Sequence, residues 1–477
     1  MLQELALLLV RWRPHFSSKA VWVRACSLLL SLLVTTARRH TITSSLRTAG
    51  RDQLPHAADY FVFSRANWEE RALFDSVTDV AVETLGQLGI GGRLVVAIDD
   101  TGLKKTGKTI AAAGWQRDPL SPAFHLNLRW GLRFVHMAVI VPGHQLGYAP
   151  VAVSIGFRLA PALKRPKKSA PQEEHTAFKV AKKKQNLSTI AVDEMRHLRE
   201  HLDQTGRKEL NVLMAGDASY LNKTILRGLP HNMDIIARVR GTVRLYAPAP
   251  AGGRKKYGDI LPTPIETRQD KGMPWQVANA YYAGARRDLR YKEVPNVMWK
   301  SAGANRVLRL IVMAPTPYRA PGGSGGRRQL YYREPAYLLT TDLTAATTEL
   351  IQAYLDRWQI EVEHRDEKSV LGVGEAQVHA DKSVVRMHSA HVAMWSMAKL
   401  AVLRTEGLAR TDAYPRRARW YPGSDRDRPS AQDIIELLRM EVRFEARRAR
   451  TLDRASEMRH DIKLKSLGLS RQIASEM

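Results

Sequence analysis

Cysteine is nearly absent from this sequence: Cys26 is the single one among 477 residues. One thiol excludes an intramolecular disulfide and any zinc site built from several cysteines, and it is typical of proteins in a reducing compartment. Long hydrophobic runs are also lacking. The apolar run from Ala25 to Val34 is too short to cross about 30 Å of hydrocarbon, and the first residues lack the positive charge that opens an export signal. We therefore expect a cytoplasmic protein without a membrane span.

Acidic residues are too few to balance the basic ones. The sequence has 74 Lys plus Arg against 47 Asp plus Glu, which leaves a formal net charge of +27. Such an excess attracts polyanions, most often nucleic acid, although a generally basic proteome without a specific partner is the alternative. Hydrophobic residues make up 44% of the chain, so it has the composition of a globular protein and not of a disordered tail.

The order of the predicted elements indicates an α/β fold. Residues 1–90 are periodic in Leu, Val and Ala, which predicts helices, and short apolar runs rich in β-branched residues then predict strands. The predicted order is three strands, a helix, a strand, a helix and a strand, at 93–98, 132–141, 150–159, 187–201, 210–215, 221–229 and 233–239. This is the order of a ribonuclease H-like core, with Asp100 at the end of the first strand and Asp217 at the end of the fourth.

Changes in composition along the chain predict five regions. They are a helical N-terminal region at 1–90, the first part of the ribonuclease H-like core at 91–240, a β-rich insertion at 241–335 with a Gly-rich segment at 322–326, the second part of the core at 336–405, and an Arg-rich helical C-terminal region at 406–477. A long helix is predicted from Ala345 to Leu371. A Pro- and Gly-marked linker at 414–429 precedes a helix that Ser430 and Asp433 are expected to cap.

Four polar residues recur on one face of the long predicted helix. Tyr354, Arg357, Glu361 and Lys368 are separated by 3, 4 and 7 residues, which places them within an arc of about 60° at roughly 100° per residue. Glu363 and Glu367 point elsewhere on the same wheel. A solvated face with helical ion pairs is the alternative interpretation of this stripe.

Two aspartates follow apolar strands. Asp100 and Asp217 occupy positions where a buried backbone holds a carboxylate rigidly, although a strand-end aspartate usually only caps a turn. Together with Glu361 they form an oxygen-rich set suited to Mg²⁺. Two such ions can activate an attacking oxygen and stabilise the leaving oxygen of a phosphodiester.

These motifs resemble those of a known family. The sequence is similar to the DDE transposases of bacterial insertion sequences in three motifs: Ile98–Asp99–Asp100–Thr101, Gly216–Asp217–Ala218 and Tyr354-x2-Arg357-x3-Glu361-x6-Lys368. Within that family it most resembles the group that includes the transposon five enzyme, whose signature is Y-x2-R-x3-E-x6-K. The resemblance covers about residues 91–405. It implies cut-and-paste transposition, with cleavage at the transposon end, in this group typically through a hairpin, and strand transfer into target DNA.

The resemblance also implies roles for individual residues. Asp100, Asp217 and Glu361 become the catalytic, metal-binding acids for two Mg²⁺ ions, for which Mn²⁺ can substitute. Tyr354, Arg357 and Lys368 hold DNA phosphates. Trp275 and Trp299 are the candidates for stacking a flipped base, and we take Trp299 as the DNA-binding one, although packing in the core is the alternative for both.

The first acid is ambiguous because Asp99 and Asp100 are strand neighbours whose side chains point to opposite faces. The family pattern places the acid directly before Thr101, which selects Asp100. His364, His379, His388 and His391 show no zinc-site spacing, so we interpret them as packing or DNA-facing residues.

We expect the basic loop from Lys164 to Lys184 to bind DNA, above all through Lys182, Lys183 and Lys184. The N-terminal region is expected to bind transposon ends, and the partners are the terminal inverted repeats and target DNA, bound by a homodimer associated with the nucleoid. Two alternatives remain: a metal-dependent endonuclease without strand transfer, and a domesticated DNA-binding protein of transposase origin.

Overall fold

We describe the protein from a computed structural model of the whole chain. The described residues are 1–110, 112–117, 125, 127–250, 252, 254–319, 330–418, 420 and 428–457. The Gly-rich segment at 322–326, residues 419 and 421–427 of the predicted linker and residues 458–477 of the predicted C-terminal region lie outside them. In the described part of the chain, no helix is both long and apolar enough to cross a membrane.

The chain forms two compact units. Unit 1 contains Met1–Gly91, Asp100–Gln185 and Glu361–Met477. Unit 2 contains Gly92–Asp99 and Asn186–Ile360. The boundary between them falls inside one strand, between Asp99 and Asp100, and inside one helix, before Glu361.

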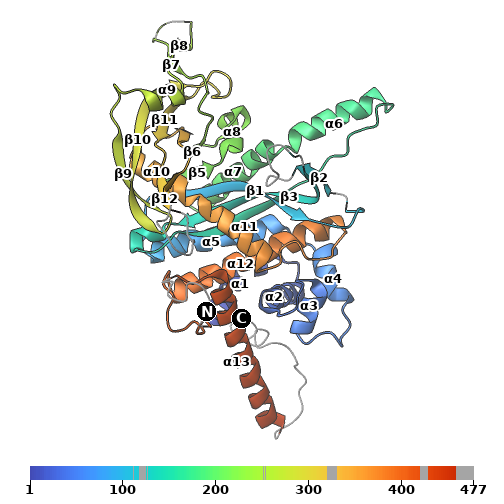
Figure 1. The fold of residues 1–477 in the computed structure, drawn as a ribbon. Coiled ribbons are helices and arrows are strands. Elements are labelled where there is room, and N and C mark those ends of the chain that lie inside the picture. Colours follow the sequence, from blue (N-terminus) through green and yellow to red (C-terminus); the bar gives the residue numbers. More distant parts are fainter. Residues whose placement is uncertain are drawn as a thin grey trace. The chain divides into compact units, whose positions relative to one another are not determined.

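Helices make up most of unit 1 (Figure 1). Their bounds are Leu2–Val10 (α1), Lys19–Val34 (α2), Ile42–Thr48 (α3), Ala57–Ser64 (α4), Glu70–Gln87 (α5), Gln172–Lys184 (α6), Asp381–Thr405 (α12) and Ala431–Glu457 (α13), with 3-10 turns at Arg13–His15 (η1) and Gly143–Leu146 (η2). The helices predicted within residues 1–90 are present. Helix α12 is buried along most of its length and packs against α1, α2, α5 and β4. A helix buried on all sides forms the core of its unit, which fits its run of Ala, Val, Met and Leu.

The strands of unit 1 pair antiparallel around β3. They are the second half of β1 (Leu94–Lys104), β2 (Gly114–Arg117), β3 (Leu128–Val141) and β4 (Val151–Ala160). Strand β3 pairs with β2 on one side through its first residues, and with β4 through Arg133–Val141. Strands β3 and β4 are thus antiparallel neighbours in the chain, separated by the segment that contains Pro142 and Gly143.

The predicted basic loop from Lys164 to Lys184 is wrong in its second half, because Gln172–Lys184 form helix α6. Glu173 and Glu174 lie in its first turn and Lys182–Lys184 in its last turn, where each sign of charge complements the helix dipole. None of the residues of α6 is buried. Helical charge patterning, and not burial of an apolar face, therefore accounts for this helix.

Unit 2 is built on a mixed sheet. Its strands are the first half of β1, β5 (Val212–Gly216), β6 (Met233–Arg238), β14 (Ala336–Thr340), β11 (Val307–Met313), β10 (Ala285–Met298), β9 (Gln276–Tyr282), β7 (Tyr246–Pro248) and β8 (Tyr257–Ile260), and β12 (Pro317–Arg319) with β13 (Leu330–Tyr332) form a separate pair. The strands β1, β5 and β6 are parallel, and β14, β11 and β10 continue the sheet antiparallel. The helices of this unit are α7 (Leu187–Gln204), η3 (Ala218–Tyr220), α8 (Lys223–Gly228), α9 (Pro264–Gln269), α10 (Thr347–Asp356) and the start of α11 (Trp358–Ser369).

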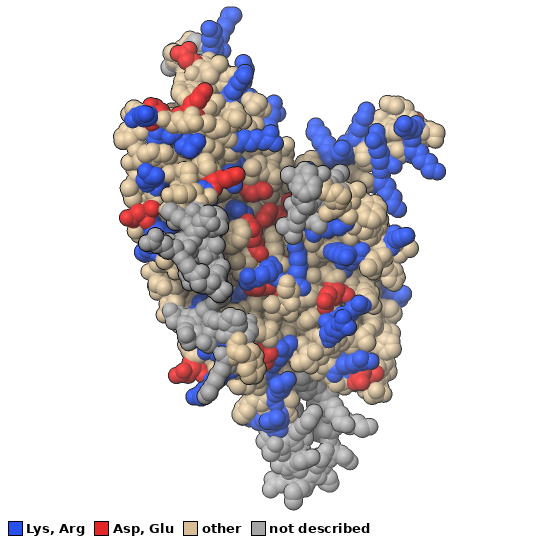
Figure 2. Space-filling model, viewed as in Figure 1, with Lys and Arg blue, Asp and Glu red and all other residues tan. Residues whose placement is uncertain are grey.

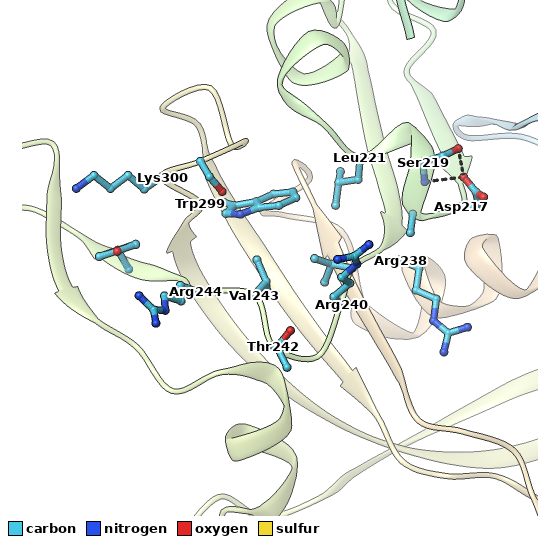
Figure 3. Close-up of a pocket in the computed structure, with 14 residues that line it drawn as sticks. Asp217, Ser219, Leu221, Arg238, Arg240, Thr242, Val243, Arg244, Trp299 and Lys300 are labelled. Atoms are coloured by element: carbon cyan, nitrogen blue, oxygen red, sulfur yellow. Dashed lines mark hydrogen bonds between the residues drawn. The ribbon is translucent and has the colours of Figure 1, made fainter. Parts of the chain in front are cut away.

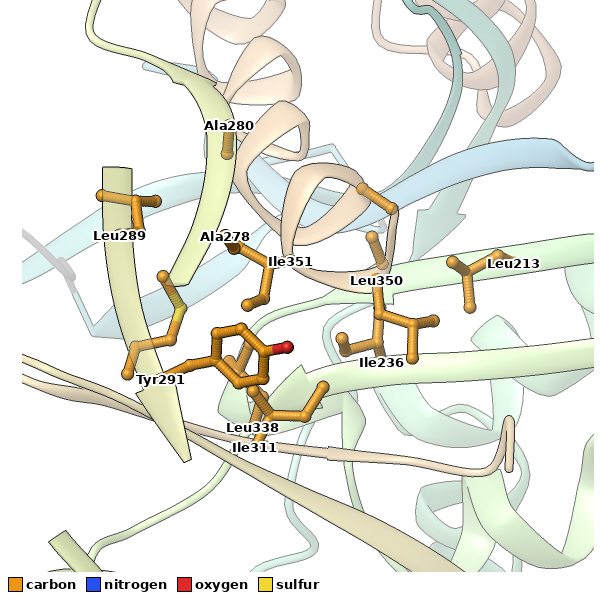
Figure 4. Packing of buried hydrophobic residues seen from close by; sticks show 13 residues of the cluster. Leu213, Ile236, Ala278, Ala280, Leu289, Tyr291, Ile311, Leu338, Leu350 and Ile351 are labelled. Atoms are coloured by element: carbon orange, nitrogen blue, oxygen red, sulfur yellow. The ribbon is translucent and has the colours of Figure 1, made fainter. Parts of the chain in front are cut away.

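All elements of the predicted core order are present, as β1, β3, β4, α7, β5, α8 and β6. One face of the unit 2 sheet packs against α10. Leu213, Ile236 and Leu338 from three strands contact Leu350 and Ile351 of that helix in a continuous buried cluster (Figure 4). Val95 of β1 packs against the same cluster. The sheet strands that precede Asp99 and Asp217 are therefore held by a rigid hydrophobic core.

The start of α13 confirms its predicted cap. The backbone N–H of Ser430 donates to Asp433 Oδ2 at 2.7 Å, and the backbone N–H of Asp433 donates to Ser430 Oγ at 3.2 Å. This reciprocal pair satisfies donors that a helix start otherwise leaves unbonded.

Candidate active site

Asp217 directly follows the last residue of β5, in unit 2. Its Oδ1 atom accepts the backbone N–H of Ser219 at 2.8 Å and the Ser219 hydroxyl at 2.6 Å, which caps the short turn η3. Gly216 makes this turn possible, because a Cβ there would lie 3.0 Å from Tyr220 Cβ and 3.3 Å from Ile98 Cγ2. Both hydrogen bonds are to Oδ1, so they orient the Asp217 carboxylate, and neither of them involves Oδ2.

Asp217 lines a cavity of about 1030 Å³ in unit 2 (Figure 3). Four basic side chains line the same cavity: Arg238, Arg240, Arg244 and Lys300. Among the described residues that line this cavity, Asp217 is the only acidic one. A cavity with one carboxylate and several cations suits an anionic ligand whose reacting group lies next to the carboxylate. The sequence analysis did not identify these arginines, although the spacing Arg238-x-Arg240-x3-Arg244, which begins at the end of a predicted strand, was a usable signal.

The two candidate tryptophans have different environments. Trp299 lines the cavity with Asp217, and a tight turn in which the Gly303 N–H donates to the Trp299 carbonyl at 2.6 Å holds its backbone. The ring of Trp275 instead has the Lys292 ammonium 4.7 Å from its centroid. Lys292 is buried, and its ammonium also donates to the Thr267 carbonyl at 3.1 Å. Trp275 therefore covers a structural lysine, whereas Trp299 faces the cavity.

Asp100 lies inside β1 and not at its end, which corrects the sequence prediction. The strand continues to Lys104 because its second half joins the sheet of unit 1. Its pairing with β5 stops earlier, at Ile98 opposite Gly216. The next residues along the two parallel strands are Asp99 and Asp217.

Strand alternation separates Asp99 from Asp100. Val95 lies opposite Leu213 and Ala97 opposite Ala215, and Val95, Leu213 and Ala215 belong to the cluster that α10 covers. Successive side chains of a strand point to opposite faces, so Asp99 shares that face with Val95, and Asp217 shares it with Ala215. Asp100 points to the other face. Strand alternation thus places Asp99 on the face that Asp217 shares, whereas the family pattern selects Asp100.

Asp100 has a basic partner on its own face. Its Oδ2 atom accepts the Arg133 Nε–H at 2.6 Å, within unit 1. The Arg133 side chain is 40% exposed, so this is a partly solvated ion pair. A charge-assisted hydrogen bond of this kind holds the Asp100 carboxylate in place.

The predicted signature helix is interrupted at Arg357. Helix α10 ends at Asp356 and α11 begins at Trp358, with Arg357 between them. The Ile360 N–H donates to the Arg357 carbonyl, three residues back, which tightens the chain at this point. Arg357 keeps helical dihedral angles (φ −48°, ψ −31°), and the common face of the four signature residues stays a prediction.

The signature residues are divided between the units. Tyr354 and Arg357 belong to unit 2, where the Arg357 guanidinium lies 5.9 Å from the centroid of the Tyr354 ring. Glu361 and Lys368 belong to unit 1, on α11.

A buried polar cluster on the inner face of α11 was not predicted. The Lys399 ammonium donates to Glu363 Oε1 at 2.6 Å, and the Ser154 oxygen lies 3.1 Å from the same atom and 3.2 Å from Glu367 Oε1. His136 Nε2 completes the cluster, 2.8 Å from the Ser154 oxygen. Burial raises the pKa of both carboxyl groups and lowers the pKa of His136. Helical periodicity alone had placed Glu363 and Glu367 away from the signature stripe without indicating that they are buried.

The predicted DNA-binding lysines Lys182, Lys183 and Lys184 lie in the exposed last turn of α6. Figure 2 shows basic side chains gathered over this helix. Among the described residues, no group of three or more His, Cys, Asp or Glu side chains is arranged to hold a metal ion. His364, His388 and His391 are buried, which agrees with a packing role, and His379 is exposed.

Comparisons with known proteins give one family. A family model described as DDE superfamily endonuclease matches residues 13–306, a range that contains Asp99, Asp100, Asp217 and Trp299 and ends before the signature. No curated protein matches the chain. Among solved structures, the chain is similar to the cryo-EM structure of a piggyBac transposase synaptic complex with hairpin DNA, with 10% sequence identity, a TM-score of 0.37, and coverage of 91% of this chain and 73% of that chain.

Proposed function

Because the chain belongs to the DDE superfamily endonuclease family, we propose that it is a DNA transposase of the group that includes the transposon five enzyme. It cuts the ends of a transposon and joins the freed 3′-hydroxyl to target DNA. The observation that carries this proposal is Asp217 at the edge of a cavity lined by Arg238, Arg240, Arg244 and Lys300. This is the combination that phosphodiester chemistry needs, a carboxylate for catalysis next to cations for the backbone.

The acids that we propose are Asp99, Asp217 and Glu361. Asp99 replaces the sequence-based choice of Asp100 in this proposal, because it lies in β1 directly after the stretch paired with β5, on the face that Asp217 shares, while Asp100 bonds Arg133. Carboxylate oxygens are the ligands that Mg²⁺ prefers, so this donor set fits Mg²⁺, and Mn²⁺ as a substitute. When bound, two such ions would activate the attacking oxygen and stabilise the leaving oxygen.

The other residues of the site bind DNA in this proposal. The cavity cations contact phosphates near the cut, and Tyr354, Arg357 and Lys368 hold the flanking backbone. Trp299 stacks a base extruded from the duplex, a contact worth about 1–3 kcal/mol per base. The protein acts as a homodimer on two transposon ends and associates with the nucleoid.

Two phosphoryl transfers make up the reaction. Water first attacks phosphorus at the transposon end, a new P–O bond forms, and the 3′-oxygen leaves with a proton. That 3′-hydroxyl then attacks a second phosphodiester in target DNA, where a new P–O bond forms as the bond from that phosphorus to its own 3′-oxygen breaks. In the hairpin route the 3′-hydroxyl first attacks the opposite strand in the same way, and water reopens the hairpin to give back the 3′-hydroxyl before joining. A metal-dependent endonuclease would perform the first step alone, and a domesticated DNA-binding protein would perform neither.

The substrate of the test is DNA from both sides of the gene, where the proposal places the terminal inverted repeats. The protein is incubated with this DNA, Mg²⁺ and a target plasmid. We expect wild-type protein to nick the end and to give joined product. Asp99→Asn, Asp217→Asn and Glu361→Gln should abolish nicking while binding of end DNA remains, since affinity comes mostly from phosphate contacts. Asp100→Asn should cut, with at most a modest loss.

Asp381→Asn is the matched control, because this aspartate is exposed at the start of α12. Nicking without joined product would replace the transposase by the endonuclease. An inactive Asp100→Asn protein beside an active Asp99→Asn protein would return the first acid to Asp100. Full nicking by Asp217→Asn would remove the whole proposal.

A further inference from the structure

Two tryptophans face each other on a hairpin of unit 1 that has no part in the site described above. Trp115 of β2 lies directly opposite Trp130 of β3 in the antiparallel register. Their ring centroids are 5.7 Å apart, and the rings cross at 70°, edge to face. This geometry is favourable for the pair itself, and it leaves flat ring surface that the partner ring does not cover.

The two rings differ in how they are held. The Trp130 indole N–H donates to the Gly107 carbonyl at 3.0 Å, which ties this ring to the loop after β1. Trp115 is 67% exposed, the second most exposed large hydrophobic side chain among the described residues. Trp130 therefore supports Trp115 from one side, and Trp115 presents its ring to solvent. The contact with Trp130 restricts the Trp115 ring before any ligand arrives, which lowers the entropic cost of binding.

The surroundings of Trp115 are basic and partly apolar. Arg117 lies two residues along β2, so it shares the face of Trp115, and it is exposed. Leu128, the cross-strand partner of Arg117, is 54% exposed. Lys108, next to the Gly107 that bonds Trp130, is exposed as well. A flat aromatic surface flanked by cations matches a nucleobase with its phosphates.

We propose that Trp115 forms a second base-stacking site, which takes an unpaired nucleobase of DNA while Arg117 and Lys108 contact the adjoining phosphates. The inference rests on DNA as the partner of the proposed function, and the net charge of +27 favours DNA over a protein partner for this surface. A base paired inside a duplex has no free face for the ring. The site therefore selects bulged, flipped or terminal bases.

The test uses a duplex with one bulged 2-aminopurine and the same duplex fully paired, both with wild-type protein. Stacking on an indole quenches 2-aminopurine, so we expect quenching of the bulged probe. Trp115→Ala should remove a large part of that quenching and weaken binding of the bulged duplex by roughly 5- to 150-fold, the equivalent of about 1–3 kcal/mol per stacked base. Binding of the paired duplex should change little, since it depends on backbone contacts.

Three variants make the result specific. Trp115→Phe keeps an aromatic face and should retain most of the preference for the bulged duplex. Leu128→Ala removes neighbouring apolar surface without removing a ring, and it should behave as wild type. Trp299→Ala removes the tryptophan of the cavity in the proposed function and leaves Trp115 in place. The part of the quenching that is lost in Trp115→Ala should therefore remain in Trp299→Ala.

Unchanged quenching and preference in Trp115→Ala would overturn the inference and leave the proposed function standing. Loss of the quenching in Trp299→Ala and not in Trp115→Ala would also overturn the inference and leave the proposed function standing. If Trp115→Ala and Leu128→Ala both changed the sedimentation of the free protein and neither changed DNA binding, the surface would bind protein, which also overturns it. A wild-type protein that binds neither duplex would overturn the inference and the proposed function together.

Discussion

The ammonium group of Lys399 bonds the Glu363 carboxylate at 2.6 Å where both side chains are only 5% exposed. The pair joins α12, the core helix of unit 1, to α11, the helix that begins with part of the signature. A buried charge is tolerated only with its counter-charge. The position of α11 in unit 1 therefore depends on this pair.

We expect Lys399→Met to destabilise unit 1 by about 3–5 kcal/mol, because it leaves the Glu363 carboxyl buried without its counter-charge. Urea unfolding followed by circular dichroism measures the loss. Arg365→Ala is the control on the same helix, since Arg365 bonds Asp366 at 3.0 Å with its side chain 67% exposed. It should cost at most about 0.5 kcal/mol. Equal losses for the two variants would contradict the role assigned to the buried pair.

Hydrogen-bond counting predicts that Glu367 is protonated. The Ser154 hydroxyl has one proton, yet its oxygen contacts Glu363 Oε1, Glu367 Oε1 and His136 Nε2. The single Ser154 proton can serve only one of the two carboxylates, and Glu363 is already the partner of Lys399, so we assign the additional proton to the Glu367 oxygen that contacts the serine. Its raised pKa, caused first by burial, agrees with this assignment.

Glu367→Gln should therefore lie within about 1 kcal/mol of wild-type stability near pH 4, where the carboxyl group is protonated in both states, because an amide N–H replaces the carboxylic O–H, and it should exceed wild-type stability at pH 7. Glu363→Gln should cost more, about 1–3 kcal/mol, because it removes an ionised partner. The folded state retains the Glu367 proton at pH values where the unfolded chain has lost it, so wild-type stability should fall as pH rises above about 4.3, and Glu367→Gln should remove that part of the slope. Similar losses for both glutamines would show that Glu367 is ionised.

Asp356 gives a second pH dependence, in unit 2. It is 4% exposed and accepts the Gln352 amide at 2.7 Å, and burial raises its pKa to about 7. Between about pH 4 and pH 7 the folded state binds a proton that the unfolded state has released, so stability falls with rising pH and then levels off. Asp356→Asn should match wild type near pH 4 and exceed its stability at pH 8, by up to about 4 kcal/mol. If Asp356→Asn shifted the urea midpoint relative to wild type by the same amount at pH 4 and at pH 8, the pH dependence would not come from Asp356.

The core order was predictable because it rests on local signals. Apolar, β-branched runs gave the start of β1 and both ends of β5 and β6 within a few residues, whereas β1 continues to Lys104, beyond its predicted end at residue 98. Helix α6 was missed because none of its residues is buried, so no apolar stripe marked it, and its charge pattern was the sole signal. No Gly or Pro marks the interruption at Arg357 in the sequence, so the sequence predicts one long helix.

The site was predictable in part. The positions of Asp217 and Trp299 on one cavity depend on the chain path through β6 and β10, which sequence spacing does not encode. The choice between Asp99 and Asp100 depends on register, because two adjacent strand residues differ in face and not in sequence context. A motif can mark both aspartates, but the pairing of Ile98 with Gly216 is what distinguishes them.

The last turn of α6 offers a test of backbone binding. Lys182, Lys183 and Lys184 are exposed, and their neutralisation to Gln should flatten the slope of log K against log[salt] for duplex DNA by up to about 0.9 per lost phosphate contact. Lys19→Gln, at the exposed start of α2, is the control and should leave the slope unchanged. If the triple variant keeps both the slope and the affinity of wild type, α6 faces solvent in the complex.

The signature residues provide a test that separates the two chemical steps. Arg357 can bind a phosphate bidentately and Lys368 as a point charge, and the second step must hold a bent strand in register whereas the first needs only water. We expect Arg357→Ala and Lys368→Ala to impair hairpin or joined product, from pre-nicked end DNA with Mg²⁺, at least as much as they impair nicking of intact DNA. Tyr354→Phe should be milder than Tyr354→Ala, because the ring that lies 5.9 Å from the Arg357 guanidinium is retained. Wild-type rates on the pre-nicked substrate for both alanine variants would reduce these residues to surface ion pairing and leave the transposase proposal resting on the acids alone.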